Sequence, residues 1–323
     1  MTEVRPTVLL LDTVHPSLSD LLEQQGWKIE PAYELSTDEV LQRFPGAKGL
    51  VIRSRFSLKR EFLSEAIGLD FVARVGAGME NIDVEAAAEL GIRCLHAPEG
   101  NQDAVAEHTM GMLLGMLNHL PRADREVRQG IWQREANRGT ELHGKTIGII
   151  GYGNMGSAFA QRLAGFGVRV LVHDTALKTE FPPHDYRTSA SLAHIQKEAD
   201  VVSLHINYIQ ENYHYVNSNW LKAFEKPIYL INTARGKVLD TRALLTSIQE
   251  GKVLGAGLDV LEFESLSFET LNPSAADVIK QLMKEERVLL TPHIAGWSLE
   301  SNEKMAVVLA NKIGTVKYSL GKG

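Results

Sequence analysis

Three glycines in the run Gly151-Tyr152-Gly153-Asn154-Met155-Gly156 constrain the fold of this chain more than any other feature. An apolar segment, Thr146–Ile150, comes directly before them, and a helical pattern over Met155–Ala164 follows. In such a strand–turn–helix the first glycine permits the tight turn and the second lets the backbone approach a pyrophosphate, while the third allows close packing of the helix on the strand. The helix N-terminus then offers N–H groups and a positive dipole end to the phosphates. The run therefore predicts a dinucleotide-binding unit rather than a glycine turn that only packs a helix.

The next strand pattern, Val168–His173, ends at an acidic residue, Asp174. A carboxylate at this place accepts hydrogen bonds from the ribose hydroxyls and repels a 2′-phosphate. The sequence therefore predicts that the cofactor is NAD rather than NADP.

Short apolar runs alternate with amphipathic stretches along the chain, which is typical of βαβ units and of parallel sheets covered on both faces. In the first hundred residues we expect strands at Val8–Leu11, Trp27–Glu30, Gly49–Ile52, Phe71–Val75 and Arg93–His96, and helices near Ser17–Gln25, Thr37–Phe44, Lys59–Ala66 and Val84–Leu90. A long apolar-rich helix is expected over 101–120, followed by an arginine-rich polar segment over 122–138. After Thr146–Ile150 and Val168–His173, strands are expected at Val201–His205, Ile228–Asn232, Gly255–Leu258 and Val288–Thr291, and a last helix at Ser301–Leu320.

Composition excludes several classes of protein. The net charge is −6, and no long run of Lys or Arg interrupts that balance, which argues against a nucleic-acid or membrane-surface partner. Cys94 is the only cysteine, so no disulfide framework or cysteine-based zinc site is expected, and His96, His108 and His119 show no metal-ligand spacing. No stretch approaches the roughly 20 apolar residues of a membrane span, and the first residues lack a signal-peptide pattern. We therefore expect a cytoplasmic protein without a bound metal.

With the residues around the glycine run added, the chain resembles the D-isomer-specific 2-hydroxyacid dehydrogenase family over nearly all of its length. The matching segments follow in the family's order: Val75-Gly76-Ala77-Gly78 with Asn81-Ile82-Asp83, Ala104–His108, the glycine run, Ile231–Gly236, Gly255–Val260, Glu264 and Thr291–Gly296. This combination is far more specific than any one of its members.

The resemblance implies that Arg235, Glu264 and His293 carry catalysis. A guanidinium holds the carboxylate of a 2-hydroxy acid with paired hydrogen bonds, and a histidine exchanges the hydroxyl proton while hydride passes to or from the nicotinamide. The glutamate would orient the imidazole and fix its tautomer. Glu262 is a competing choice for this acid, because the family usually has Pro after the glutamate and this chain has Ser265. The spacing from Asp259 favours Glu264.

Further ligand contacts are implied by position in the family. The cofactor would contact the glycine run, Asp174 and seven further residues: His205 (through its backbone), Thr233, Ala234, Arg235, Asp259, His293 and Gly296. The substrate would contact Gly76, Ala77, Gly78, Asn101 and Arg235. Bare backbone N–H groups at Gly76–Gly78 can approach a carboxylate. The pair Arg53 and Arg55, after a strand end, suits a phosphate or second carboxylate, with a solvated loop as the alternative.

The expected fold is two doubly wound parallel-sheet α/β domains of the Rossmann and flavodoxin type: a discontinuous substrate domain, 1–100 plus 296–323, and an NAD-binding domain, 101–295, with the active site in the cleft between them. The expected activity is NAD-dependent oxidation of a D-2-hydroxy acid, most like the 3-phosphoglycerate dehydrogenases of serine biosynthesis. A glyoxylate or hydroxypyruvate reductase and an NADH-sensing, corepressor-like binding protein are the alternatives. A homodimer through helix 101–120 is expected, with 122–138 reaching toward the partner.

Two features stay open. The stretch 265–286 is longer than in many relatives, and an extra helix is expected near Ala275–Lys284. Trp297 suits either the substrate pocket or simple packing.

Overall fold

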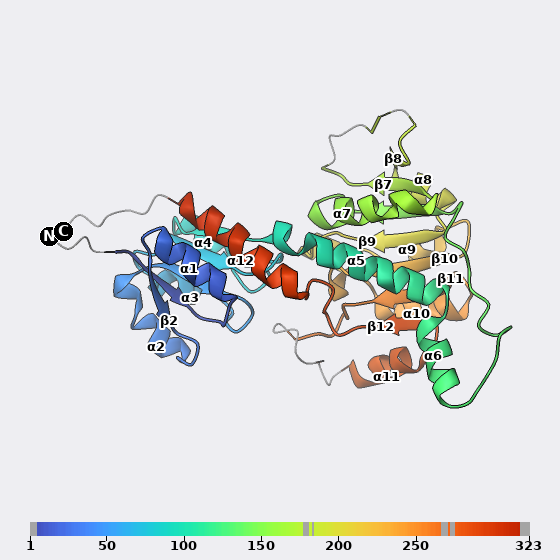
Figure 1. Cartoon of the computed structure of the whole chain (residues 1–323), viewed down its shortest axis with the longest axis horizontal. Helices are drawn as coiled ribbons and strands as arrows, with labels where there is room; N and C mark the ends of the chain where they lie inside the picture. Colours follow the sequence, from blue (N-terminus) through green and yellow to red (C-terminus); the bar gives the residue numbers. More distant parts are fainter. Residues whose placement is uncertain (1–4, 177–180, 183, 266–270, 272–274, 317–323) are drawn as a thin grey trace. The chain divides into compact units, whose positions relative to one another are not determined.

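The computed structural model describes residues 5–176, 181–182, 184–265, 271 and 275–316 (Figure 1). These residues form two compact units, each with its own parallel sheet. Unit 1 joins the segment that ends at Asn101 to the segment that begins at Trp297, and unit 2 takes most of the chain from Gln102 to Gly296. The expected two-domain α/β architecture is therefore confirmed at the level of fold class.

Unit 1 contains a five-stranded parallel sheet in the order β2-β1-β3-β4-β5. Its strands are β1 (Thr7–Leu10), β2 (Lys28–Pro31), β3 (Ala47–Ile52), β4 (Phe71–Arg74) and β5 (Arg93–His96). Its helices are α1 (Pro16–Gln24), α2 (Thr37–Leu41), α3 (Arg60–Glu65), α4 (Val84–Glu89) and, from the far end of the chain, α12 (Leu299–Gly314).

The strands of unit 1 send alternate side chains to two cores. Val8, Leu10, Val51 and Ala73 pack with residues of α1 and α12 on one face, where these two helices lie side by side (Figure 1). Leu9, Leu50, Ile52 and Val72 pack with residues of α2, α3 and α4 on the other. Because successive side chains of a strand point to opposite faces, each strand contributes apolar residues to the cores on both faces of the sheet.

Unit 2 contains a seven-stranded parallel sheet in the order β12-β11-β10-β9-β6-β7-β8. Its strands are β6 (Thr146–Ile150), β7 (Arg169–His173), β8 (Arg187–Ser189), β9 (Val201–Leu204), β10 (Ile228–Asn232), β11 (Val253–Leu258) and β12 (Val288–Leu290). Its helices are α5 (Pro98–Leu117), whose first turn lies in unit 1, α6 (Leu120–Arg128), α7 (Asn154–Leu163), α8 (Leu192–Glu198), α9 (Ser218–Lys222), α10 (Thr241–Gln249) and α11 (Ala276–Lys284). The strand order reverses between β6 and β9, which is where open α/β sheets bind ligands at the carboxyl ends of their strands.

Most expected strands and helices are present, and the helix expected near Ala275–Lys284 is confirmed as α11. The short strand β8 was missed, because its three residues are mostly polar and half-buried or exposed. The long helix was placed wrongly: α5 ends at Leu117, and His119 takes a left-handed φ of 53° before α6 begins. One continuous helix over 101–120 is therefore incorrect, and the arginine-rich segment begins within α6.

The last helix also differs from the prediction. α12 starts two residues early because Ser298 and Ser301 form a capping box at its N-terminus. It ends at Gly314, so the expected helix is wrong at residues 315 and 316, while 317–320 lie outside the described residues. No helix of the described chain is long and apolar enough to cross a membrane.

Candidate active site

The three predicted catalytic residues follow three neighbouring strands. Arg235 follows β10, Glu264 follows β11 and His293 follows β12, and these strands stand next to one another in the sheet of unit 2. Because the strands are parallel, their carboxyl ends lie on one edge of the sheet. The order of the strands therefore places these three residues, which are 29 or more positions apart in the sequence, at one edge of this sheet.

Glu264 and His293 are in direct contact. The imidazole Nδ1 of His293 lies 2.8 Å from Oε2 of Glu264, and both side chains are largely buried, with exposed fractions of 22% and 12%. The other carboxylate oxygen of Glu264 accepts the backbone N–H of Leu261, which closes a tight turn. His293 itself has a left-handed φ of 58°, an uncommon conformation for a residue with a side chain. Such strain is found where the surrounding structure holds a functional group in place.

Asp259 supplies that support. Its carboxylate is 1% exposed and accepts hydrogen bonds from the Thr291 hydroxyl at 2.6 Å and from the N–H groups of Ile294 and Ala295 at 2.9 Å. The N–H of His293 donates to the Asp259 carbonyl at 2.7 Å. The residue therefore fixes the turn that carries His293, and its expected contact with the nicotinamide stays a prediction.

The loop of Arg235 packs against the turn of Glu264. The Asn232 amide donates to the Arg235 carbonyl and accepts from the Ala234 N–H, each at 3.0 Å, which braces the loop. A Cβ on Gly236 would come within 1.9 Å of the Leu261 carbonyl oxygen, so only glycine permits this approach. The backbone of the Arg235 loop and the turn that carries Glu264 are thus packed directly against each other.

The alternative acid, Glu262, belongs to a different cluster. One of its oxygens lies 2.7 Å from Nε2 of His214, and the other accepts the Thr241 N–H at 3.1 Å. With Asp240, these residues form a group whose donors could lie around a cation. However, His214 faces Glu262 with Nε2 and Asp240 with Nδ1, and a metal ion would use only one of these nitrogens. Only Glu264, of the two candidate acids, contacts His293.

The glycine run has the geometry that a dinucleotide requires. Gly151 has a φ of +91°, and a Cβ there would lie 2.7 Å from the His205 carbonyl oxygen. A Cβ on Gly156 would lie 2.0 Å from the Gly151 carbonyl oxygen, so helix α7 packs directly on the turn. Gly153 is different, because nothing lies within 4 Å of a Cβ built on it. Gly153 also caps α7 without a side chain, which leaves open backbone beside the N–H groups of the helix.

Asp174 lies beside this turn. Its two oxygens accept the N–H of Tyr152 at 2.6 Å and the N–H of Ala176 at 2.7 Å, so the carboxylate is fixed against the glycine run. Each oxygen has a second lone pair, which a ribose hydroxyl can use. The chemistry of this donor and acceptor set fits NAD.

His205 turns its ring away from the glycine turn. Its Nε2 lies 2.8 Å from the Ser203 hydroxyl, its ring packs 5.5 Å from that of Phe159 on α7, and its buried Nδ1 has no hydrogen-bond partner in the described chain. Burial lowers the pKa of His205 from 6.5 to about 3. The His205 carbonyl lies against Gly151, and the expected contact of this backbone with the cofactor stays a prediction.

The remaining predicted cofactor residues, Thr233 and Ala234, lie in the braced loop after β10, where the Thr233 hydroxyl contacts that of Thr109 at 3.0 Å. Gly296 is the last residue of unit 2, three residues beyond His293.

In unit 1, the loop after β4 turns its carbonyl groups inward. The Gly76 carbonyl accepts the Ala97 N–H at 2.9 Å, the Ala77 carbonyl lies 2.6 Å from Nδ1 of His96, and the Gly78 carbonyl accepts from Nη1 of Arg74 at 2.6 Å. Within the described chain no hydrogen bond is recorded from the N–H groups of residues 76–78. Successive unpaired N–H groups form an anion-binding concavity. Sequence reasoning missed Arg74 and His96, although each ends the strand beside this loop.

The two arginines after β3 have different surroundings. The guanidinium of Arg55 donates to the carbonyls of Leu11 and Ala32 at 3.2 Å, of Leu35 at 2.6 Å and of Tyr33. Its nitrogens are therefore engaged with the protein's own backbone, which argues against the phosphate contact that was expected of Arg55. Arg53 instead lies over the ring of Trp297, 4.9 Å from its centroid. Asn101 lies in the first turn of α5, with its buried Oδ1 lacking a partner among the described residues.

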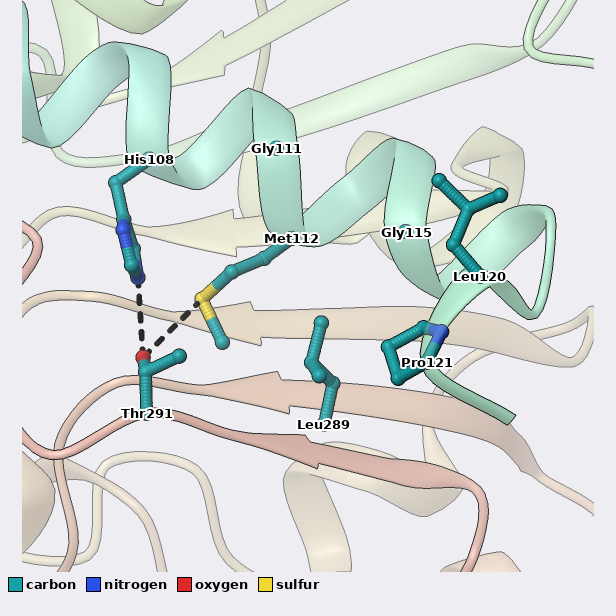
Figure 2. A pocket seen from close by; sticks show the side chains of 8 residues that line it. All are labelled: His108, Gly111, Met112, Gly115, Leu120, Pro121, Leu289 and Thr291. Atoms are coloured by element: carbon teal, nitrogen blue, oxygen red, sulfur yellow. Dashed lines mark hydrogen bonds between the residues drawn. The ribbon is translucent and has the colours of Figure 1, made fainter. Parts of the chain in front are cut away.

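A separate apolar cavity of about 230 Å³ lies along α5 (Figure 2). Gly111 and Gly115 of α5 form one wall, Leu120 and Pro121 close one end, and Leu289 of β12 lies opposite. His108, Met112 and Thr291 line the other end, where the Thr291 hydroxyl lies 3.0 Å from Nε2 of His108.

Comparison with known proteins gives consistent results. Residues 110–295 match the model of the NAD binding domain of D-isomer specific 2-hydroxyacid dehydrogenases, which is more than half of the chain. A hydroxypyruvate reductase of Thermotoga maritima is 33% identical, and the match covers 86% of this chain and 88% of the relative. A D-3-phosphoglycerate dehydrogenase of Methanocaldococcus jannaschii is 31% identical, and the match covers 96% of this chain. The same match covers only 57% of that relative's length.

A solved structure is also similar. The D-lactate dehydrogenase of Aquifex aeolicus, complexed with NAD and lactic acid, has a TM-score of 0.79 and 29% identity, with 95% of this chain and 94% of that chain covered. The sequence match and the structural similarity thus agree on the fold and the family.

Proposed function

The chain belongs to the D-isomer specific 2-hydroxyacid dehydrogenase family, and from that premise we propose that it interconverts a D-2-hydroxy acid and its 2-keto acid with a second anionic group at the far end. NAD, when bound, supplies the site that accepts or returns the hydride. The protein's own residues bind the substrate, orient it and move one proton. The single observation that carries the proposal is the contact of 2.8 Å between His293 and Glu264 on the sheet edge that also bears Arg235.

The proton step belongs to His293. With Nδ1 held by Glu264, Nε2 is the nitrogen that exchanges a proton with the substrate oxygen. In oxidation this nitrogen takes the hydroxyl proton, and in reduction it returns a proton to the keto oxygen. Glu264 keeps the ring in one tautomer and stabilises the imidazolium that forms during oxidation.

The substrate carboxylate has two proposed partners. The carbonyl groups of residues 76–78 are bound to Ala97, His96 and Arg74, and no hydrogen bond from their N–H groups is recorded among the described residues. Arg235 supplies a planar guanidinium that suits bidentate contact with a carboxylate. Each of these groups is, by its own chemistry, a proposed partner for that carboxylate.

The proposed identity of the substrate depends on its distal anionic group. Arg53 offers a guanidinium on the same unit as the 76–78 loop, and among charged three-carbon acids 3-phosphoglycerate is the first candidate. A hydroxypyruvate or glyoxylate reductase is the second candidate, because Arg55 is engaged with backbone carbonyls and the hydroxypyruvate reductase relative is matched over most of its length.

The test is a substrate panel with NADH. We expect the specificity constant kcat/KM for 3-phosphohydroxypyruvate to exceed those for hydroxypyruvate and glyoxylate, and Arg53→Ala to remove about one to two powers of ten of that advantage. Arg55→Ala is the control for general disturbance of the loop. A preference for hydroxypyruvate in the unmodified protein would establish the second candidate instead.

For assembly, we propose a homodimer through the surface that contains the apolar cavity and α6. The methionines 110, 112 and 116 are buried within the protein's own core and do not support this proposal. Support comes from exposed apolar side chains on and after α6: Leu120, Val127, Ile131 and Trp132. Clustered exposed apolar groups mark interaction surfaces more often than scattered ones.

A further inference from the structure

Trp297 is exposed in a way that packing does not explain. Its exposed fraction is 70%, and it precedes Ser298, the N-cap of α12. The reciprocal hydrogen bonds between Ser298 and Ser301, both 2.9 Å, fix the backbone at this point. The indole is therefore held at a defined place on unit 1 while most of its surface stays outside the core.

The contact that Trp297 makes is with Arg53. The guanidinium carbon lies 4.9 Å from the ring centroid, within the range of a cation–π interaction. Both residues belong to unit 1, so this contact lies within one compact body.

The backbone of Arg53 is fixed on both sides. Its N–H donates to Oδ2 of Asp12 at 2.6 Å, and its carbonyl accepts from Nε of Arg74 at 3.0 Å and from the Asn81 amide at 3.2 Å. Its guanidinium, in contrast, makes no recorded hydrogen bond to the described residues. The aromatic face is thus the contact that sets the direction of this side chain, whereas Arg55 has its direction set by four carbonyl groups.

A guanidinium that lies on an aromatic face keeps its N–H donors available at its edge. Because the guanidinium of Arg53 makes no recorded hydrogen bond to the described residues, its edge can bind an anion such as a phosphate or a carboxylate.

We infer that Trp297 is a positioning residue for substrate specificity: it holds Arg53 so that the guanidinium edge binds the distal anion, a phosphate or a second carboxylate, of the substrate. This inference rests on the proposed function and deepens it. The other role open to an exposed indole is a wall for an apolar substrate side chain, and the two roles predict opposite specificity changes.

The test compares Trp297→Ala, Trp297→Phe and, as the matched control, Leu299→Ala, which removes a neighbouring side chain that is 90% exposed. The kcat/KM ratio between 3-phosphohydroxypyruvate and glyoxylate should fall about three- to tenfold in Trp297→Ala, mainly through KM. It should be largely restored in Trp297→Phe and unchanged in Leu299→Ala. A parallel run with 2-ketoisocaproate tests the apolar-wall role, which predicts a loss for this substrate instead.

Two further measurements make the outcome decisive. In an Arg53→Ala background, Trp297→Ala should cause no additional loss, because the two residues act on the same anion. Thermal unfolding of each variant separates loss of specificity from loss of structure. Additive losses, or an unchanged ratio in Trp297→Ala, would overturn the inference while the proposed function stands. A wild-type enzyme with no preference for a distal anion would overturn the proposed substrate class first.

Discussion

At the scale of single residues, the choice between two acids shows what a sequence leaves undecided. Glu262 and Glu264 are two positions apart in a turn, and nothing in their local composition separates them. The structure directs one carboxylate to His293 and the other to His214, with 2.8 Å and 2.7 Å contacts. Spacing from Asp259 favoured the acid that contacts His293, but only the path of the turn, held by Leu261 and Gly236, explains why.

The catalytic roles can be tested at this scale. His293→Ala should lower kcat by about 10²–10⁴-fold, because it removes general acid–base catalysis, while NADH still binds with nearly unchanged affinity. Glu264→Gln should lower kcat strongly, whereas Glu262→Gln should change it by less than about threefold because it does not contact the imidazole. Steady-state kinetics and NADH fluorescence titration provide the two readouts. A larger loss of kcat in Glu262→Gln than in Glu264→Gln would show that Glu262, and not Glu264, orients His293.

His205 makes a prediction about stability and pH. Burial holds its pKa near 3, well below the value of 6.5 in the unfolded chain. At pH values between these two pKa values, His205 is protonated in the unfolded state but not in the folded state. Its contribution to the free energy of unfolding is therefore fully present above about pH 6.5 and decreases as the pH falls. His205→Gln should flatten this dependence by up to about 1.4 kcal/mol per pH unit. Urea unfolding at pH 7 and pH 5 measures the change, with the exposed His194→Gln as control; equal slopes in all three proteins would contradict it.

At the scale of elements, the strands were predicted well because parallel strands buried on both faces appear as continuous apolar runs. Helix ends were predicted less well, since they depend on individual residues. His119, with its left-handed φ, separates α5 from α6, and the Ser298 capping box starts α12 early. Neither conformation follows from apolar periodicity, and the polar edge strand β8 carries almost no apolar signal at all.

The strand–turn–helix of β6 and α7 allows a prediction about cofactor binding. A Cβ on Gly153 would meet nothing within 4 Å, and the φ of this residue is −75°, so Gly153→Ala should leave the protein folded with an unchanged unfolding midpoint. It should nevertheless weaken NADH binding about tenfold or more, because the added methyl group occupies the space through which the backbone approaches the pyrophosphate. Gly165→Ala, also without neighbours within 4 Å but at the far end of the helix, is the matched control. Unchanged NADH affinity in Gly153→Ala would place the cofactor elsewhere.

At the scale of the whole molecule, the fold class and the order of the site residues could be predicted, because the site residues follow strand ends that the sequence indicates. The contacts that individual side chains make could not be predicted. Arg53 and Arg55 look equivalent in sequence, yet one lies on an indole from the opposite end of the chain and the other is surrounded by carbonyl groups. Arg74, which ties the Arg53 carbonyl to that of Gly78, gives no sequence signal because a strand-end arginine is ordinarily solvated.

The last prediction concerns assembly. Trp132 and Ile131, which follow α6, are 77% and 39% exposed, and Leu120 at the start of α6 is 57% exposed beside the cavity lined by Gly111 and Gly115. An exposed tryptophan and an apolar cavity are complementary features, and a two-fold axis could satisfy both in each subunit at once. Stable interfaces bury about 1,200–2,000 Å², which the cavity alone cannot provide, so the segment after α6 must contribute.

We therefore expect light scattering to show a dimer at micromolar concentration. The double variant Ile131→Ser with Trp132→Ser should dissociate into monomers, because it removes the apolar groups that a partner would bury. Ile67→Ser, which changes a side chain that is 83% exposed on unit 1, should leave the dimer intact and serves as the control for exposed apolar residues in general. A monomeric wild-type protein would refute the dimer itself. A dimer that survives the double substitution would place the interface away from Ile131 and Trp132.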